Sequence, residues 1–522
     1  MSEMNGAQAL IRTLVACGVD TCFANPGTSE MHFVAALDAV PEMRGVLGLF
    51  EGVATGAADG YARMAERPAV TLLHLGPGLG NGVANLHNAR KARVPMVNVV
   101  GDHATYHKQY DAQLESDIET VARNVSPSWV RTSTSTAAVG QDAADAVAAA
   151  TAPPGQVATL ILPADVSWSE GGEVAAPVER TVRAEVPTET IDTVAKVVRS
   201  GEPVGLLVGG SALRERGLMA ASRIAEAAQA KLLCETFPTR LERGAGLPAV
   251  ERLAYLGEFA LGQMAGLRHL VLVDAKAPVS FFAYPDKPSY LVPEGCEVHV
   301  LAGGGDDVAG ALEALAEAVG APSDAAAVQS AGRPATPTGE LTADAVAQAV
   351  AALLPEGAIV SDEANTSGLM APQHTTGAPP HDWLCLTGGA IGQGLPLSTG
   401  AAVACPDRKV INLQADGSAL YTLQALWTQA RESLDVVTIL YNNRSYAILN
   451  MELNRVGAEP PGPKARSLLD LSQPDIDFVA LARGLGVPAH RATTADELSD
   501  QLARALIEPG PALIEAMVPS FL

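Results

Sequence analysis

Residues 409–453 read KVINLQADGSALYTLQALWTQARESLDVVTILYNNRSYAILNMEL, and this stretch decides the fold class. One apolar run ends at Asp416, a helical pattern follows over residues 418–433, and a second apolar run ends at Asn443. Runs without polar alternation are typical of strands buried on both faces of a parallel sheet. The stretch therefore predicts a strand–helix–strand unit whose strands end at one sheet edge, where open α/β folds bind ligands.

The ends of these two strands carry oxygen donors. Asp416 offers a carboxylate oxygen, Asn443 an amide oxygen, and the backbone after Asn443 a carbonyl oxygen, a mixture that suits Mg²⁺ or Ca²⁺. A helix beginning near Ser418 would direct its first N–H groups to the same place, which favours an anion. The pattern thus predicts a divalent cation beside a diphosphate. On these residues alone, ordinary turns at Asp416-Gly417 and Asn442-Asn443 remain an alternative.

Similar apolar runs recur along the chain and alternate with helical patterns, which indicates an α/β protein. These further runs span residues 70–76, 94–102, 157–166, 203–210, 269–275, 297–303, 357–363 and 512–518. Two segments, 167–187 and 322–339, are rich in Pro, Gly and small polar residues and read as linkers. We therefore expect three open parallel-sheet domains, over residues 1–166, 188–321 and 340–522.

Composition limits the possible partners. The 522 residues carry a formal net charge of −23, which disfavours binding to nucleic acid or to an anionic membrane surface. We find no apolar stretch long enough for a membrane span and no signal-peptide pattern at the N-terminus. Six scattered cysteines without a CxxC pair favour a reducing compartment, so we expect a cytoplasmic protein.

The stretch 409–453 resembles the thiamin-diphosphate-binding motif of the family of acetolactate synthases, pyruvate decarboxylases and benzoylformate decarboxylases. Other motifs in the family's order extend this resemblance over essentially the whole chain, and acetolactate synthase large subunits look most similar. The resemblance implies the thiamin-diphosphate enzyme (pyruvate decarboxylase-like) fold, with a pyrimidine-binding domain, a central domain and a diphosphate-binding domain in that order. It also implies Mg²⁺ ligation by Asp416, Asn443 and the Ser445 carbonyl, and diphosphate contacts from Gly417 and Ser418.

Further motifs imply the remaining cofactor contacts. Glu51, in the segment Phe50-Glu51-Gly52, matches the glutamate that hydrogen-bonds the cofactor's aminopyrimidine and activates it; as an isolated residue it could equally be a solvated helix residue. By the same match, the Gly389 carbonyl binds the exocyclic amine and Ile391 is the apolar wedge that bends the cofactor. Asn365 and Thr366 are expected near the diphosphate.

The substrate side is less determined. Thr28 and His74 match substrate-pocket positions of the decarboxylase branch, although helix capping or a structural role could explain either residue. Glu452 stands where acetolactate synthases carry an acceptor-selecting Trp, and residues 281–285 lack the second pocket histidine of benzoylformate decarboxylase. A basic cluster at residues 103–108 could attract a carboxylate or form a solvated loop.

The resemblance implies a thiamin-diphosphate- and Mg²⁺-dependent enzyme acting on 2-oxo acids. Our first hypothesis is acetolactate-synthase-like decarboxylation with carboligation; alternatives are a non-oxidative decarboxylase releasing an aldehyde and a non-catalytic cofactor-binding relative. FAD stays open, because Gly209-Gly210-Ser211 alone does not establish a flavin site. The resemblance also implies a homodimer or homotetramer in which Glu51 of one subunit and Asp416 of another form a site at the interface.

Overall fold

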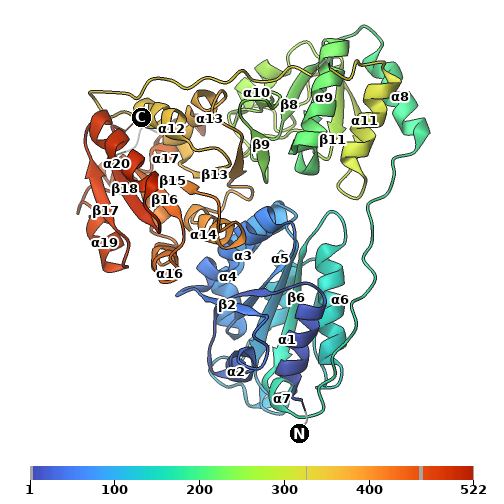
Figure 1. Cartoon of the computed structure of the whole chain (residues 1–522), viewed down its shortest axis with the longest axis vertical. Coiled ribbons are helices and arrows are strands. Elements are labelled where there is room, and N and C mark those ends of the chain that lie inside the picture. The colour runs from blue at the N-terminus through green and yellow to red at the C-terminus, as the bar shows by residue number, and fades with distance from the viewer. Residues whose placement is uncertain (1–3, 325, 458–461, 521–522) are drawn as a thin grey trace.

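The computed structural model describes residues 4–324, 326–457 and 462–520, which form three sheets (Figure 1). The first sheet is entirely parallel and has the order β2-β1-β3-β4-β6-β5. Its strands are β1 (Thr21–Asn25), β2 (Arg44–Leu47), β3 (Ala69–Leu73), β4 (Met96–Asp102), β5 (Val130–Thr132) and β6 (Val157–Pro163). The helices around it are α1 (Gly6–Ala16), α2 (Met31–Leu37), α3 (Glu51–Ala65), α4 (Leu75–Lys91), α5 (Ile118–Val125), α6 (Val139–Thr151) and α7 (Ala164–Trp168).

The second sheet is also parallel, with the order β10-β8-β7-β11-β12. Its strands are β7 (Val204–Val208), β8 (Lys231–Cys234), β10 (Glu251–Arg252), β11 (His269–Val273) and β12 (Glu297–Ala302). The helices of this part are α8 (Thr188–Val198), α9 (Glu215–Ala228), α10 (Gly257–Gln263) and α11 (Val308–Ala318). Figure 1 shows this part, in green and yellow, beside the other two sheets.

The third sheet has the order β17-β18-β16-β15-β13-β14-β9. Its parallel strands are β13 (Ile359–Glu363), β14 (His381–Cys385), β15 (Val410–Ala415), β16 (Val436–Asn442), β17 (Ala489–Ala492) and β18 (Ala512–Met517). The edge strand β9 (Leu241–Arg243) comes from the middle of the chain and pairs antiparallel with β14. The helices are α12 (Ala343–Leu353), α13 (Ala371–His374), α14 (Gly394–Ala404), α15 (Asp416–Ala419), α16 (Ala425–Arg431), α17 (Ala447–Arg455), α18 (Pro463–Ser467), α19 (Phe478–Gly484) and α20 (Ala495–Ile507).

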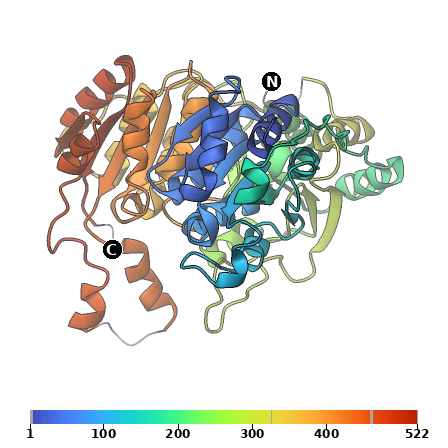
Figure 2. The ribbon, with the colours of Figure 1, turned by 90° about the horizontal axis from the view of Figure 1, so that it is seen from below.

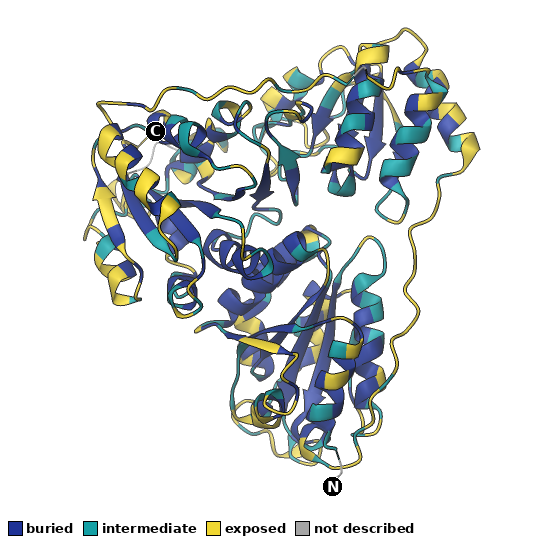
Figure 3. Ribbon diagram, viewed as in Figure 1, coloured by how far each residue is buried: buried dark blue, intermediate teal, exposed yellow. Residues whose placement is uncertain are grey.

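Each apolar run identified in the sequence overlaps a strand of one of these sheets. Strands β4, β6 and β16 are buried along their whole length, as a sheet covered by helices on both faces requires (Figure 3). The described residues of the segments after α7 and after α11 form neither helix nor named strand up to residues 188 and 343, and exposed residues dominate them in Figure 3. Ser167, expected in a linker, lies in α7 instead.

The single helix expected over residues 418–433 is wrong in its extent. The chain forms α15 and α16 with a turn between them. In this turn the Tyr421 and Thr422 N–H groups donate to carbonyls three residues earlier, and the Thr422 hydroxyl donates to the Gly392 carbonyl at 2.9 Å. The hydrogen bond from the Thr422 side chain to the loop at Gly392 thus favours the turn over a continuous α-helix.

Helices α3 and α14 join the first and third sheets. A Cβ atom on Gly60 would overlap the Leu397 carbonyl oxygen, and one on Gly400 would overlap the Ala57 carbonyl oxygen. Glycine is therefore required at both positions for the two backbones to approach so closely. This contact fixes the first turn of α3, which carries Glu51, relative to the loop that precedes α14.

Among the described helices, none has the length and apolar character that crossing a bilayer demands. The six cysteines are all free thiols.

Candidate functional site

Asp416 and Asn443 meet at the carboxyl edge of the third sheet. Strand β15 pairs with β16 in a register that sets Ala415 opposite Tyr441, so the residues that follow the two strands are neighbours. The Asp416 carboxylate accepts the N–H groups of Gly417 and Arg444, each at 2.7 Å. The chain segment after β16 is therefore tied directly to the carboxylate that follows β15.

The donor set fits a divalent cation. The Asn443 side-chain oxygen accepts the Ser445 N–H at 2.9 Å, which draws Asp416, Asn443 and Ser445 into one turn. Asp416 is only 3% exposed, and burial raises its pKa to about 6. A carboxylate held out of water beside neutral oxygen donors is suited to Mg²⁺, whose charge would stabilise the ionised form.

The turn after β15 is closely packed. A Cβ atom on Gly417 would overlap the ring of Tyr446, so no larger residue fits between this turn and α17. The Ser418 hydroxyl donates to the Ala415 carbonyl at 3.1 Å and accepts the Gln414 amide at 2.7 Å. These bonds present the first turn of α15 to the sheet edge.

Asn365 and Thr366 follow β13, the strand next to β15 in the sheet. They begin the short helix η4 (Asn365–Gly368), and Asn365 is exposed with a φ of 51°. The Ser367 hydroxyl lies 3.5 Å from the Asn443 amide nitrogen. The structure therefore brings this segment to the same edge as Asp416 and Asn443.

Glu363 is a site-forming residue that the sequence reasoning did not assign. Its carboxylate accepts the N–H groups of Gly392, Gln393 and Gly394 at 2.7, 3.2 and 2.7 Å, and the Gln414 amide at 2.9 Å. Burial raises the pKa of Glu363, while these four donors favour its ionised form. The available signal was the position of Glu363 at the end of a buried strand, two residues before Asn365.

The loop carrying Gly389 and Ile391 is anchored from the first sheet's side as well. Asn88 of α4 donates to the Ala390 carbonyl at 2.8 Å and accepts the Ala390 N–H at 3.2 Å. Gly389 has a φ of 74°, and a Cβ atom there would lie 2.5 Å from Cζ of Phe281. Ile391 is half-buried between these anchors. The loop is thus rigidly held with its central residues at the surface of the site.

Glu51 begins α3 and is 6% exposed. Its Oε2 atom accepts the Asn81 amide at 3.0 Å, and a Cβ atom on Gly78 would lie 3.1 Å from its Oε1 atom. The first two turns of α4 therefore pack against the Glu51 carboxylate, and the glycine at 78 leaves room for it. A buried carboxylate at a helix N-terminus is electrostatically favoured there.

His74 caps α4 and pairs with a buried carboxylate. Glu30 Oε2 lies 2.8 Å from His74 Nδ1 and accepts the Gly27 N–H at 2.7 Å. Burial raises the pKa of Glu30, which is 1% exposed. Thr28, exposed at the start of η1 (Thr28–Glu30), lies on the same loop. Glu30 lies two residues after Thr28, but its bond to His74 spans 44 residues and no local pattern indicates it.

The basic cluster at residues 103–108 is already neutralised in part. Lys108 Nζ lies 2.6 Å from an Asp102 oxygen and 3.2 Å from a Glu115 oxygen. The ammonium is therefore paired with two carboxylates of its own chain, and it does not form a free cationic patch for a substrate.

An aromatic cluster from the middle of the chain borders the Gly389 loop. The Phe281 ring makes edge or tilted contacts with three other rings, at centroid distances of 5.8, 5.3 and 4.9 Å; these rings are Phe237, Tyr255 and Phe282. We call these four residues the aromatic cluster. The hydroxyls of Tyr255 and Tyr284 donate to the Glu452 carboxylate at 3.2 and 3.1 Å. Glu452 lies on α17, and the orange-red segment containing α17 and α18 projects from the body of the molecule in Figure 2.

The Gly209-Gly210-Ser211 loop, where a flavin site stays open, packs closely against side chains of its own chain. A Cβ atom on Gly210 would overlap the Asp274 carboxylate, and one on Gly209 would lie 2.6 Å from the Glu235 carboxyl carbon. Asp274 also accepts the Ser211 N–H at 3.0 Å. The Asp274 carboxylate is itself paired with the Arg93 guanidinium at 2.6 Å, so the loop packs against an ion pair of its own chain.

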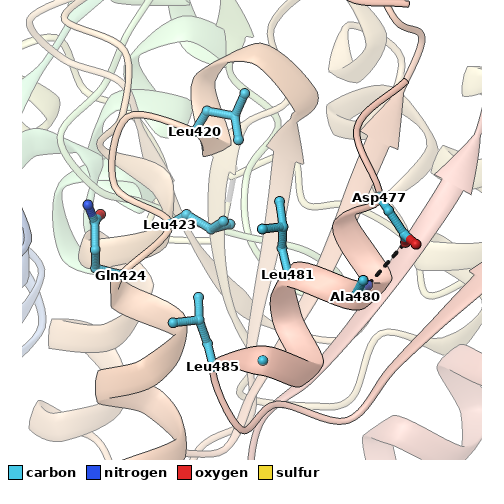
Figure 4. A pocket seen from close by; sticks show the side chains of 8 residues that line it. Leu420, Leu423, Gln424, Asp477, Ala480, Leu481 and Leu485 are labelled. Carbon is cyan, nitrogen blue, oxygen red and sulfur yellow. Dashed lines mark hydrogen bonds between the residues drawn. The ribbon is translucent and has the colours of Figure 1, made fainter. Parts of the chain in front are cut away.

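A further pocket of about 690 Å³ lies between the turn after α15 and helix α19 (Figure 4). Most of its lining is apolar, and its residues are Leu420, Leu423, Gln424, Asp477, Ala480, Leu481, Gly484 and Leu485. The one ionisable group, Asp477, caps α19 by accepting the Ala480 N–H at 3.0 Å. The pocket therefore lacks the convergent polar groups of a catalytic site.

Comparison with known proteins supports the same reading of the fold and the family. The models described as the N-terminal and C-terminal TPP binding domains of thiamine pyrophosphate enzymes match residues 4–122 and 365–516. A Mycobacterium tuberculosis protein named "Putative acetolactate synthase large subunit IlvX" is 64% identical over 99% of both chains. Benzoylformate decarboxylase of Pseudomonas aeruginosa is 30% identical over 95% of this chain and 96% of its own. The solved thiamine diphosphate-dependent 4-hydroxybenzoylformate decarboxylase of Rhodococcus jostii matches 99% of both chains with a TM-score of 0.85 and 25% identity. These findings confirm the resemblance and the three-sheet α/β fold: the chain belongs to the thiamine pyrophosphate enzyme family.

Proposed function

We propose that this protein is a thiamin-diphosphate- and Mg²⁺-dependent enzyme that decarboxylates a 2-oxo acid. The observation that carries the proposal is the buried Asp416 carboxylate, tied at 2.7 Å to the segment that bears Asn443 and Ser445. When bound, the cofactor supplies a carbon nucleophile and stabilises the negative charge left by loss of CO₂. The protein's own residues hold, orient and polarise the reactants.

The two ends of the chain hold different parts of the cofactor. Residues 1–166 form the pyrimidine-binding domain, residues 188–321 form the central domain, and residues 340–522 form the diphosphate-binding domain. Asp416, Asn443 and the Ser445 carbonyl hold the metal, and Glu51 holds a ring nitrogen of the pyrimidine and moves a proton there. Diphosphate contacts come from Asn365, Thr366, Gly417 and Ser418, and pyrimidine contacts from the Gly389 carbonyl and Ile391.

His74 and Thr28 act on the substrate side. The Glu30 carboxylate holds Nδ1 of His74, which leaves Nε2 to bind the substrate carboxylate or to move a proton. Thr28, exposed on the same loop, can donate its hydroxyl to a substrate oxygen. Glu30 and Glu363 are positioning residues, since they act through His74 and through the loop before α14.

For the second half of the reaction, we favour carboligation of the acetolactate synthase type. It is supported by the name of the 64% identical relative, which the chain matches along its whole length. Aldehyde release from an aryl 2-oxo acid is the second candidate. The aromatic cluster beside Gly389 suits an aryl group, Glu452 replaces the acceptor-selecting Trp, and two relatives are named as benzoylformate or 4-hydroxybenzoylformate decarboxylases.

We further propose a homodimer or homotetramer with the site between Glu51 of one subunit and Asp416 of another. Leu420 and Tyr421 are 41% and 52% exposed directly after the cofactor turn, and Leu49 is 45% exposed before Glu51. Apolar side chains of this kind beside both half-sites support burial by a second copy. A cytoplasmic location remains a prediction from the sequence.

The test is to reconstitute the protein with thiamin diphosphate and Mg²⁺ and to incubate it with pyruvate, 2-oxobutyrate and benzoylformate, measuring CO₂ and products. Acetolactate from pyruvate supports carboligation, and benzaldehyde from benzoylformate supports the second candidate. Asp416→Asn should lose cofactor and metal binding by calorimetry, while the exposed Asp407→Asn should not. A wild-type protein that fails to bind the cofactor would exclude both enzymatic proposals. Normal binding without CO₂ release from any 2-oxo acid would favour a non-catalytic relative.

A further inference from the structure

The second sheet carries a cluster of metal-ligating side chains at the N-terminal ends of two of its strands. The cofactor residues proposed above lie elsewhere, on the first and third sheets. His269 begins β11, and Glu297 and His299 lie on the neighbouring strand β12. Glu297 is the register partner of His269, and His299 is two residues further along, so both β12 side chains share one face. Among the described residues, these three form the only group of its kind. We call it the His–Glu–His cluster.

The ligand atoms of the cluster converge. His269 Nδ1 lies 3.1 Å from His299 Nε2, and each of these nitrogens lies 3.9 Å from Oε2 of Glu297. These separations bracket the roughly 3.4 Å between neighbouring ligand atoms of a tetrahedral Zn²⁺ site with bonds of about 2.1 Å. The two imidazole rings are tilted by 50° and not stacked, so their nitrogens and not their faces approach each other.

A carboxylate outside the cluster fixes one of the imidazoles. Glu202, in the turn before β7, accepts from His269 Nε2 at 3.0 Å. Metal-binding histidines commonly donate the N–H of their second ring nitrogen to a carboxylate in this way. The other ring nitrogen then carries a lone pair that can bind the metal. The backbone holds the arrangement, because the His269 N–H donates to the Pro203 carbonyl and the Glu297 N–H to the Arg268 carbonyl.

From this geometry we propose that the His–Glu–His cluster binds one Zn²⁺-class transition-metal ion through His269 Nδ1, His299 Nε2 and the Glu297 carboxylate. Two imidazoles and one carboxylate favour Zn²⁺ or Co²⁺ over Mg²⁺, which prefers oxygen ligands. The Glu297 side chain is 74% exposed, so the ion can enter from solvent and keep a water as fourth ligand. Strand β12 is the edge of its sheet, and the ion would fasten it to β11.

The test uses the holoenzyme, saturated with thiamin diphosphate and Mg²⁺ and freed of transition metals by a chelator. Co²⁺ is then titrated, and its visible absorption, which reports a tetrahedral site, is read together with the thermal midpoint. We expect one Co²⁺ per chain, displaced by Zn²⁺, and a higher thermal midpoint with metal. Glu297→Ala removes an exposed ligand without disturbing the core, and His299→Ala removes a part-buried one; both should abolish the band. Glu202→Gln should weaken Co²⁺ binding about 10- to 100-fold.

Two controls separate this site from others. His374, which pairs singly with Asp344 at 2.8 Å, offers His374→Ala as a matched variant that should keep the Co²⁺ band. Cys296, next to Glu297 in the chain, offers Cys296→Ser, which should also keep it. A wild-type protein without a Co²⁺ band would overturn the proposal. So would a band that persists in Glu297→Ala and His299→Ala, or one that disappears only in Cys296→Ser.

Discussion

Glu30 Oε2 lies 2.8 Å from His74 Nδ1, and the same oxygen accepts the N–H of Gly27. This pair is closely packed, because a Cβ atom on Gly27 would overlap the His74 ring and one on Gly101 would overlap the Glu30 carboxylate. The Glu30 Oε1 atom is buried without a partner among the described residues. The chain thus holds a carboxylate of raised pKa against the imidazole, a costly arrangement that is typical of functional sites.

We predict that Glu30→Gln lowers kcat about 10- to 100-fold and changes the pH dependence of kcat more than KM. A neutral amide oxygen accepts from His74 and Gly27 more weakly than a carboxylate oxygen, so the imidazole is held less firmly in its orientation. The measurement is a full pH–rate profile of the best 2-oxo acid substrate. Glu42→Gln, at an exposed position, is the control. A profile of Glu30→Gln that matches the wild type would show that the pair is only structural.

Glu51→Gln should lower turnover by about 10²- to 10⁴-fold, because an amide cannot move a proton at the cofactor's pyrimidine. Binding of thiamin diphosphate should change little, since the glutamine can keep a hydrogen bond and the metal ligands are intact. Single-turnover CO₂ release and calorimetric cofactor binding would separate the two effects. Near-normal turnover would contradict the activating role of Glu51.

Most strands could be predicted because they coincide with continuous runs of apolar residues in the sequence. Strands β4, β6 and β16 are buried throughout, and each coincides with such a run. Strands β9 and β10 carry no such signal, since they have three and two residues and contain Arg and Glu. β9 also pairs with β14 of the third sheet, Leu241 opposite Trp383, about 140 residues away in the chain, and no local pattern encodes that partner.

For the site, sequence reasoning could identify residues at strand ends but not the contacts that hold them. Asp416 and Asn443 follow two adjacent strands, so their proximity follows from sheet topology. Glu363 binds a loop about 30 residues away, and this contact appears only when β13 and α14 are packed together. Thr422 likewise breaks the expected helix through a bond to Gly392, 30 residues away.

Glu363→Gln should destabilise the protein by about 2–3 kcal/mol and weaken cofactor binding. The wild-type carboxylate accepts four hydrogen bonds, two at each oxygen. In the glutamine variant the NH₂ group would replace one of these oxygens, and it could not accept from the two donors that face it. The loop of residues 392–394 would then lose its anchor. Thermal unfolding and cofactor titration test both effects, with the exposed Glu356→Gln as control. An unchanged thermal midpoint would mean that the loop is held by other contacts.

Burial raises the pKa of Glu235 to about 7; the Arg93 guanidinium opposes this rise and the Asp274 carboxylate adds to it. The folded protein therefore holds a proton on Glu235 that the unfolded chain, with an ordinary pKa of 4.5, has already released in this range. Since the folded state binds the extra proton, the free energy of unfolding should fall as pH rises from about 5 to about 8, by roughly 2–3 kcal/mol from this group alone. Glu235→Gln cannot ionise, so it should gain stability relative to the wild type across the same window. Thermal midpoints of both proteins at the two pH values measure this difference. A gap between the proteins that stays constant with pH would show that Glu235 titrates normally in the fold.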